Sequence, residues 1–294
     1  MSARKLLVPV AVFGTALAVM SSALCAVEGH RAPIRGIEMY YEIHGPAQGG
    51  KVGVPLVLLH GGGSTLDASF GHALPFFARD RQVIAIEEQG HGRTSDRDAP
   101  FRFDTSADDV DALLAHLGVE RADLLGFSNG ASVALQVAIR HPARVRKLVF
   151  ASSFTKRDGA RPELWGFLAK ADFATMPQPL KDEFLRVNPD PAKLRNMHDK
   201  DLARMRSFED VPDEALRALR APTLVLLGDR DVTRLEHAIE ITRLIPDARL
   251  LVVPGGHGDY WGEIVARAQT KSNTVADDAT ESVVRWVEQF LGAP

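Results

Sequence analysis

The sequence contains a single cysteine, Cys25, among its 294 residues. One cysteine cannot form an intramolecular disulfide and cannot build a cysteine-based zinc site. An excess of charge of either sign is also lacking, because 35 Lys and Arg stand against 38 Asp and Glu. A chain so close to neutrality has no overall field that would attract nucleic acid or an anionic membrane surface. The remaining composition, 45% hydrophobic with 24 Gly and 17 Pro, is that of a globular protein and excludes collagen-like, disordered and disulfide-rich classes.

Residues 1–26 differ in pattern from the rest of the chain. Two basic residues precede an apolar run over residues 6–20, and small residues follow up to Ala26. This order is typical of a secretory signal peptide. The run is short for a bilayer span, which needs about 20 residues. We therefore expect residues 27–294 to form an exported domain, periplasmic or secreted, with no membrane span in the mature chain.

Leu24 affects both the predicted cleavage site and the possibility of lipid attachment. It is a poor residue at the third position before a cleavage site at Ala26, so cleavage anywhere from Ala23 to Ala26 fits the pattern. Lipid attachment to Cys25 is the alternative mature form, and Leu24 fits that signal poorly too. We rank the lipid-anchored form below free export.

Short apolar runs alternate with segments of helical periodicity in the remaining chain. A continuously apolar run is typical of a strand buried on both faces of a parallel sheet. We expect strands at residues 34–43, 55–59, 82–86, 123–127, 145–151, 223–227 and 249–253, and helices at 104–117, 131–140 and 282–291. Such alternation with tight glycine turns predicts an α/β fold with a mainly parallel sheet.

The alternation stops over residues 154–219, where aromatic residues, prolines and polar helical pieces follow one another. We expect a helical insertion that lies as a lid over the rim of the sheet, not an independent domain. Its aromatic residues either line a substrate pocket or form a small core of the insertion itself. They include Phe154, Trp165, Phe167 and Phe173.

Ser128 lies in the pattern Gly-Phe-Ser-Asn-Gly, from Gly126 to Gly130, between a predicted strand and a predicted helix. A nucleophile held in this way needs a very sharp turn, and the flanking glycines relieve the crowding. The N-terminus of the following helix favours negative charge that develops beside the serine. A glycine-flanked turn with a capping serine is the plainer interpretation, but the strand–turn–helix setting favours a nucleophile.

A serine nucleophile needs a base, and the base needs an orienting carboxylate. Asp231 and His257 follow two late predicted strands, in the chain order serine, acid, histidine. Both lie just past the carboxyl end of a strand, where open parallel sheets place their ligands. Asp229 competes with Asp231, but its position nearer the strand suits a turn or capping residue.

The oxyanion of a tetrahedral intermediate needs two N–H donors. We expect them from Asn129, directly after the nucleophile, and from Gly62 in the glycine run that follows a strand, with Gly63 as the next choice. His60 fits a structural hydrogen-bonding role better than a catalytic one. The ten histidines show no ligand spacing, and no dinucleotide or phosphate-binding motif is present. We therefore expect no metal and no cofactor.

Together these segments resemble the α/β-hydrolase family, in its lidded, esterase-like branch. The resemblance spans about Ile34 to Leu291 and rests on five ordered motifs, which are residues 58–62, 90–94, 126–130, 228–231 and 256–257. It implies a mostly parallel eight-stranded sheet flanked by helices, with Ser128, Asp231 and His257 as the triad. Glu87 and Thr94 depart from the usual Asp and Ser at positions that brace a loop, and neither change affects the triad.

This resemblance implies a serine hydrolase that cleaves an ester of a small to medium molecule through an acyl-enzyme. Carbon–carbon bond hydrolysis or perhydrolysis uses the same triad and stays open, because the insertion and pocket decide between them. A non-catalytic binding protein on the same fold is the alternative from another class. The expected partner is a small-molecule substrate, with no nucleic acid and no particular oligomeric state indicated.

Overall fold

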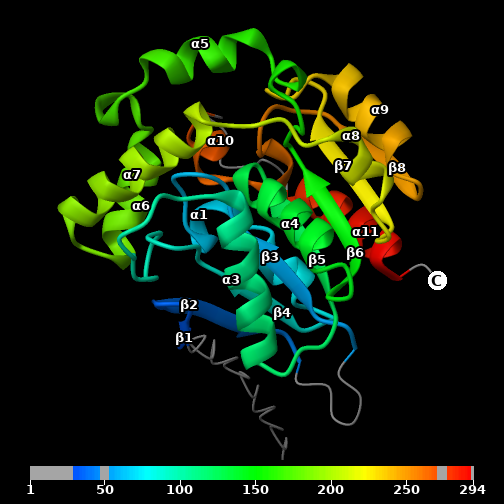
Figure 1. The fold of residues 1–294 in the computed structure, drawn as a ribbon, viewed down its shortest axis with the longest axis horizontal. Coiled ribbons are helices and arrows are strands. Elements are labelled where there is room, and N and C mark those ends of the chain that lie inside the picture. Colours follow the sequence, from blue (N-terminus) through cyan, green and yellow to red (C-terminus); the bar gives the residue numbers. More distant parts are fainter. Residues whose placement is uncertain (1–28, 47–52, 270–276, 293–294) are drawn as a thin grey trace, which may run out of the picture.

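The computed structural model describes residues 29–46, 53–269 and 277–292. The predicted signal peptide, including Cys25, lies outside the described residues. An eight-stranded sheet forms the centre of the molecule, and helices cover both of its faces (Figure 1). The predicted fold class is confirmed.

The strands are β1 (Gly29–Ile34), β2 (Ile37–His44), β3 (Leu56–Leu59), β4 (Val83–Ile86), β5 (Ala122–Phe127), β6 (Val145–Ala151), β7 (Thr223–Gly228) and β8 (Ala248–Val253). Their order in the sheet is β1-β2-β4-β3-β5-β6-β7-β8. Antiparallel pairing joins β1 to β2 and β2 to β4, and the other neighbours pair in parallel. The central strands β3, β4 and β5 are buried along their whole length, as their apolar runs predict.

The first predicted strand, at residues 34–43, is in fact β2 together with the end of an additional strand, β1. The two form a hairpin that turns at Arg35 and Gly36. The sequence of β1, Gly-His-Arg-Ala-Pro-Ile, is half polar and contains Pro33. Proline is tolerated here because β1 lies at the edge of the sheet, where one row of backbone groups has no strand partner.

Two apolar layers separate the sheet from its helices. On one face lie α3 (Phe103–His116), α4 (Asn129–Arg140) and α9 (Leu235–Leu244), which bury their apolar sides against the sheet. The opposite face carries α1 (Leu66–Phe70), α2 (Leu74–Phe77), the short η3 (Asp259–Trp261) and α11 (Asp277–Gly292). The remaining helix before α11 is α10 (Ile264–Gln269).

The helical insertion between β6 and β7 contains η1 (Arg157–Gly159), α5 (Pro162–Lys170), η2 (Phe173–Thr175), α6 (Gln178–Val187), α7 (Pro191–Arg206) and α8 (Asp213–Arg217). Figure 1 shows α5, α6 and α7 beyond the edge of the sheet toward which the parallel strands point, whereas α8 lies beside α9. Two small apolar clusters hold the insertion together. This placement puts helices over the carboxyl ends of the strands, where the predicted site residues lie.

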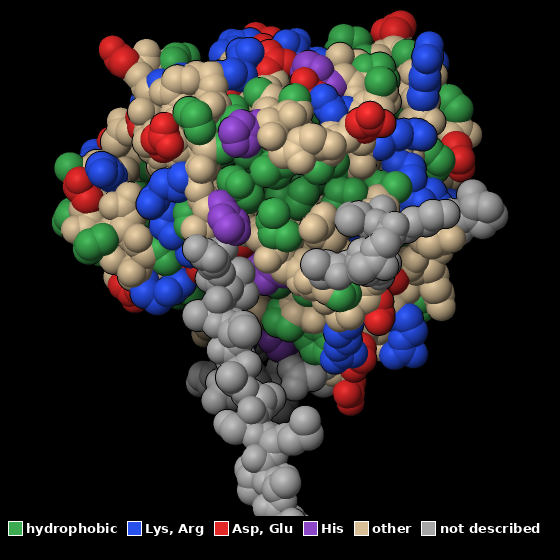
Figure 2. Space-filling model, turned by 90° about the horizontal axis from the view of Figure 1, so that it is seen from below, with side chains coloured by type: hydrophobic (Ala, Val, Ile, Leu, Met, Phe, Trp, Pro, Cys, Tyr) green, Lys and Arg blue, Asp and Glu red, His purple; other side chains and the backbone are tan. Residues whose placement is uncertain are grey.

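The side of the molecule away from α5 carries charges of both signs. Figure 2 shows Lys and Arg interspersed with Asp and Glu around its rim, with hydrophobic side chains gathered toward the centre. The mixed pattern on the described residues of this face agrees with the near neutrality of the chain.

Candidate active site

Ser128 occupies a sharp turn between β5 and α4. Its backbone angles, φ of 56° and ψ of −121°, lie in a region that residues with a side chain rarely adopt. A Cβ on Gly126 would lie 2.1 Å from the carbonyl oxygen of Gly130, and a Cβ on Gly130 would lie 2.1 Å from that of Leu59. Only glycine fits at both positions, so the packing around the turn holds Ser128 in its strained conformation.

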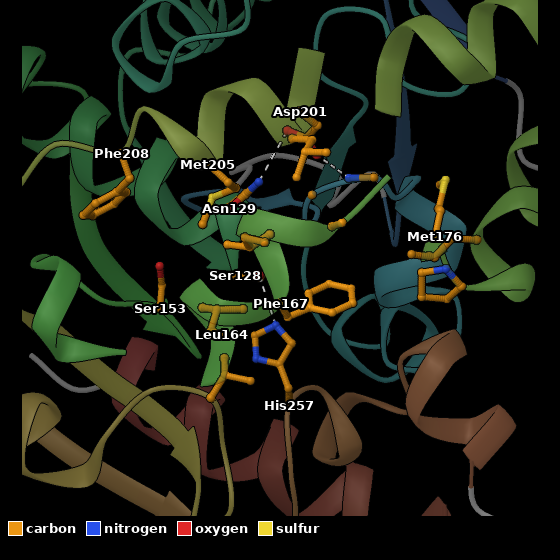
Figure 3. A pocket seen from close by; sticks show the side chains of 18 of the residues that line it. Ser128, Asn129, Ser153, Leu164, Phe167, Met176, Asp201, Met205, Phe208 and His257 are labelled. Carbon is orange, nitrogen blue, oxygen red and sulfur yellow. Dashed lines mark hydrogen bonds between the residues drawn. The ribbon is translucent and has the colours of Figure 1, made fainter. Parts of the chain in front are cut away.

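His257 joins the two other predicted triad residues. Its Nδ1 lies 2.8 Å from Oδ1 of Asp231. Its Nε2 lies 3.0 Å from Oγ of Ser128, as Figure 3 shows. A carboxylate can only accept, so Nδ1 carries the hydrogen and the lone pair of Nε2 faces the serine hydroxyl. The structure therefore brings together three residues that span 129 positions of the sequence. Their hydrogen bonds connect them as a nucleophile, a base and an orienting acid require.

The carboxylate of Asp231 has further partners. It is 1% exposed, and it accepts the N–H of Val232 at 2.7 Å and the hydroxyl hydrogen of Ser152. The Tyr260 hydroxyl lies 2.5 Å from Oγ of Ser152. Sequence analysis missed Ser152 and Tyr260, because Ser152 reaches Asp231 across 79 positions of the chain.

Electrostatics stabilise the charged forms of the acid and the base. Burial favours the neutral acid, but His257 and Ser152 outweigh it and lower the pKa of Asp231. Burial also disfavours the imidazolium, but Asp231, assisted by Glu263 and Asp259, raises the pKa of His257. The two opposite shifts favour the ion pair that forms when His257 takes a proton.

Asp229, the competing acid, is exposed and accepts the N–H of Gly255 at 2.8 Å. Its carboxylate braces the loop that carries His257. This is the turn role that the sequence predicts for it.

The backbone N–H groups of Gly62 and Asn129 form a pair of free hydrogen-bond donors. In the part of the chain that the structure describes, neither N–H has a hydrogen-bond acceptor. The N–H groups of Gly61 and Gly63 are already bonded to side chains. Gly62 and Asn129 both line the cavity beside Ser128, so the arrangement favours Gly62 over Gly63 as the second donor.

Two loops near the donor pair are braced by side chains. The Nε2 atom of His60 accepts the N–H of Glu88 at 3.0 Å, and its Nδ1 donates to the carbonyl of Gly61 at 2.8 Å. Burial lowers the pKa of His60 to about 4, so the ring is neutral and structural. The Thr94 hydroxyl donates to the carbonyl of Glu87 at 2.7 Å, which is a bracing role of the kind expected.

A cavity of about 250 Å³ opens beside Ser128, between the sheet and the insertion (Figure 3). Most of its wall is apolar and includes Phe154, Leu164, Phe167, Leu168, Met205 and Phe208. Of the aromatic residues singled out from the sequence, Phe167 lines the cavity, and Trp165 and Phe173 pack in the small clusters of the insertion. Phe154 does both, because it lines the cavity and also belongs to one of the clusters. Both interpretations of these residues thus hold.

Asp201, on α7, adds a buried carboxylate to the cavity wall. Sequence analysis missed it, because a polar helix with few apolar positions gives no sign of which side faces inward. Within the described ranges, no group of three or more His, Cys, Asp or Glu is placed to hold a metal ion. Nor does any helix there have the length and apolar character needed to cross a membrane.

Comparison with known proteins places the chain among related sequences. The family described as "alpha/beta hydrolase fold" matches residues 54–214. The dihydrolipoyllysine-residue acetyltransferase component of an acetoin cleaving system from Pseudomonas putida is 33% identical over 232 residues, which cover 71% of this chain and 60% of that protein. The 2-hydroxymuconate semialdehyde hydrolase of Pseudomonas sp. strain CF600 is 32% identical over 246 residues, covering 75% of this chain and 85% of that protein.

Solved structures show the same fold. A serine hydrolase involved in carbazole degradation superposes with a TM-score of 0.70 at 22% identity, over 90% of this chain and 99% of that one.

Proposed function

Because this chain belongs to the α/β-hydrolase fold family, we propose that it is a serine hydrolase that cleaves an ester of a small to medium molecule through an acyl-enzyme. One observation carries the proposal: hydrogen bonds connect Asp231 through His257 to Ser128 at the edge of an apolar cavity. A serine hydroxyl becomes a useful nucleophile only beside such an oriented base.

Acylation begins when Oγ of Ser128 attacks the ester carbonyl carbon and Nε2 of His257 takes the serine proton. Asp231 stabilises the imidazolium that forms. The negative oxygen of the tetrahedral intermediate accepts hydrogen bonds from the N–H groups of Gly62 and Asn129, each contributing about 3 kcal/mol. His257 then donates its proton to the departing alkoxide, and the alcohol leaves.

Deacylation repeats these steps with water. His257 takes a proton from a water molecule, whose oxygen attacks the acyl carbon. The same donor pair stabilises the second tetrahedral intermediate. When it collapses, the proton returns to Ser128 and the acid is released.

Carbon–carbon bond hydrolysis with the same triad is the second candidate, favoured by the similarity to 2-hydroxymuconate semialdehyde hydrolase. The name of that protein's substrate denotes a carboxylate, and a carboxylate in an apolar cavity needs a cationic or N–H partner. The described residues that line this cavity include no Lys or Arg, and the Nδ1 atom of the lining residue His198 already contacts Asp199. The free N–H pair beside Ser128 is used by the oxyanion. We therefore place ester hydrolysis first, with an uncharged acyl group against the apolar wall.

The test measures initial rates on p-nitrophenyl esters of graded acyl length and on a 2-hydroxy-6-oxo-dienoate. We expect turnover of the esters, and loss of at least about 10³-fold in kcat for Ser128→Ala. The matched control is Ser153→Ala, because the hydroxyl of Ser153 also lines the cavity but pairs with Ser132 at 3.0 Å. Faster turnover of the dienoate than of any ester would reverse the ranking.

We also propose that residues 1–26 direct export of the chain. Their basic start, apolar run and small-residue end support this. The intact mass of the protein recovered from the periplasm of a bacterial host tests it: loss of 23 to 26 residues is expected, whereas a full-length cytoplasmic product contradicts it.

A further inference from the structure

One carboxylate of the insertion contacts both segments that carry the free N–H donors. Asp201, on α7, accepts the N–H of Gly63 through Oδ2, and the side-chain amide of Asn129 lies 3.4 Å from Oδ1 (Figure 3). Gly63 directly follows Gly62, and Asn129 is itself the second donor residue. The two contacts join segments that are 138 and 72 positions away from Asp201 in the chain.

Gly62 has no room for a side chain on the side that faces these contacts. A Cβ on Gly62 would lie 2.3 Å from Nδ2 of Asn129 and 2.7 Å from Oδ2 of Asp201. The side chains of Asn129 and Asp201 therefore pack directly against the backbone of Gly62.

Buried partners hold Asp201 in place. Arg204, one turn further along α7, forms ion pairs with Asp201 and with Glu88, the latter at 2.9 Å. Glu88 follows β4 and also accepts the hydroxyl hydrogen of Ser106 at 3.0 Å. Asp201, Arg204 and Glu88 are each less than 10% exposed. These ion pairs connect α7 to the loop after β4.

The charge state of Asp201 suits this arrangement. Burial favours the neutral acid, but Arg204, His91 and the N–H of Gly63 outweigh it and hold the pKa of Asp201 well below its usual range. As a carboxylate, it can accept hydrogen bonds through both oxygens. Burial of ionised groups carries a desolvation free energy that apolar packing between helices does not. The buried carboxylate is therefore weak evidence of a purely stabilising role.

We propose that Asp201 is a positioning residue for the oxyanion hole: by contacting the Gly62–Gly63 turn and Asn129 together, it couples the seating of α7 to the alignment of the two N–H donors. The proposal rests on the proposed function, since it presumes a tetrahedral intermediate at Ser128. It makes the insertion part of the catalytic geometry as well as part of the cavity wall.

The test compares Asp201→Ala and the isosteric Asp201→Asn with Asp199→Asn. Asp199 lies on the same helix but is exposed, and it pairs with Arg195 at 2.7 Å. For Asp201→Ala we expect kcat on an ester to fall about 10²-fold, the effect of a misplaced oxyanion donor, with KM changed less than about threefold. The fall in kcat should be smaller for Asp201→Asn, because its amide oxygen still accepts one N–H. Asp199→Asn should have the kcat and KM of the wild type.

Phenylboronic acid, which forms an anionic tetrahedral adduct with an active serine, supplies a readout that a merely structural role would not move. Its affinity should fall by the same factor as kcat/KM in the Asp201 variants. If Asp201→Ala does not fold, Asp201→Asn and Asn129→Ala carry the test. Unchanged kcat and boronate affinity in folded variants of an active enzyme overturn the inference. A wild type that neither turns over esters nor binds the boronate overturns the proposed function instead.

Discussion

Ser152 donates its hydroxyl hydrogen to Oδ2 of Asp231, while the other carboxylate oxygen, Oδ1, accepts the N–H of His257. The Tyr260 hydroxyl must then donate to Ser152, whose own hydrogen is already used. Each carboxylate oxygen of Asp231 therefore accepts a side-chain hydrogen bond, one from Ser152 and one from His257.

Removal of the Ser152 hydroxyl should loosen the acid and, through it, the imidazole. We expect Ser152→Ala to lower kcat about tenfold, the equivalent of one hydrogen bond to a charged group. Tyr260→Phe should lower it less, because Ser152 still reaches Asp231. Steady-state kinetics of both variants check this order. A larger loss in Tyr260→Phe would contradict the direction of donation.

The pH dependence of kcat/KM should follow His257, which must be neutral to act as base. Since Asp231, Glu263 and Asp259 raise its pKa, activity should be lost as pH falls through a midpoint above the ordinary value of about 6.5. Asp231→Asn removes the largest raising charge, so the midpoint should move to lower pH while kcat falls by about 10⁴-fold.

Asp229→Asn is the control for this profile, because its amide oxygen can still accept the N–H of Gly255. We expect its midpoint to match the wild type. A wild-type midpoint below that of Asp231→Asn would show that Asp231 does not raise the pKa of His257.

The glycines around Ser128 should tolerate no side chain. We expect Gly126→Ala or Gly130→Ala to lower the free energy of unfolding by more than about 3 kcal/mol, because the new Cβ meets backbone atoms at 2.1 Å. Gly166→Ala is the control, because Gly166 lies exposed within α5 and a Cβ there would meet nothing within 4 Å apart from its chain neighbours and the helix backbone. Alanine there should raise stability by about 0.5–1 kcal/mol. Urea denaturation followed by circular dichroism measures the free energy of unfolding of the three variants.

The sequence predicted the parts of the fold that depend on local pattern. The strands ending before His60, Ser128 and Asp229 are short, apolar and followed by glycines or turn residues, so local chemistry identified them. The edge strand β1 escaped prediction because its residues alternate poorly and include Pro33. Its place depends on pairing with β2, which local pattern does not show.

The supporting residues of the site could not be predicted in this way. Ser152, Tyr260 and Asp201 act through contacts that arise only when distant segments meet, and each is a polar residue in an unremarkable local context. The insertion presents the same difficulty, because the packing of its helices decides which of its aromatic residues reach the cavity.

Covalent labelling tests whether Ser128 is an activated nucleophile. The full chain is incubated with a fluorophosphonate and analysed by intact mass and peptide mapping. We expect a single adduct on Ser128, absent in Ser128→Ala and formed much more slowly in a His257→Gln variant. An adduct on another residue, or none on a folded protein, would contradict this expectation and favour a non-catalytic binding protein on this fold.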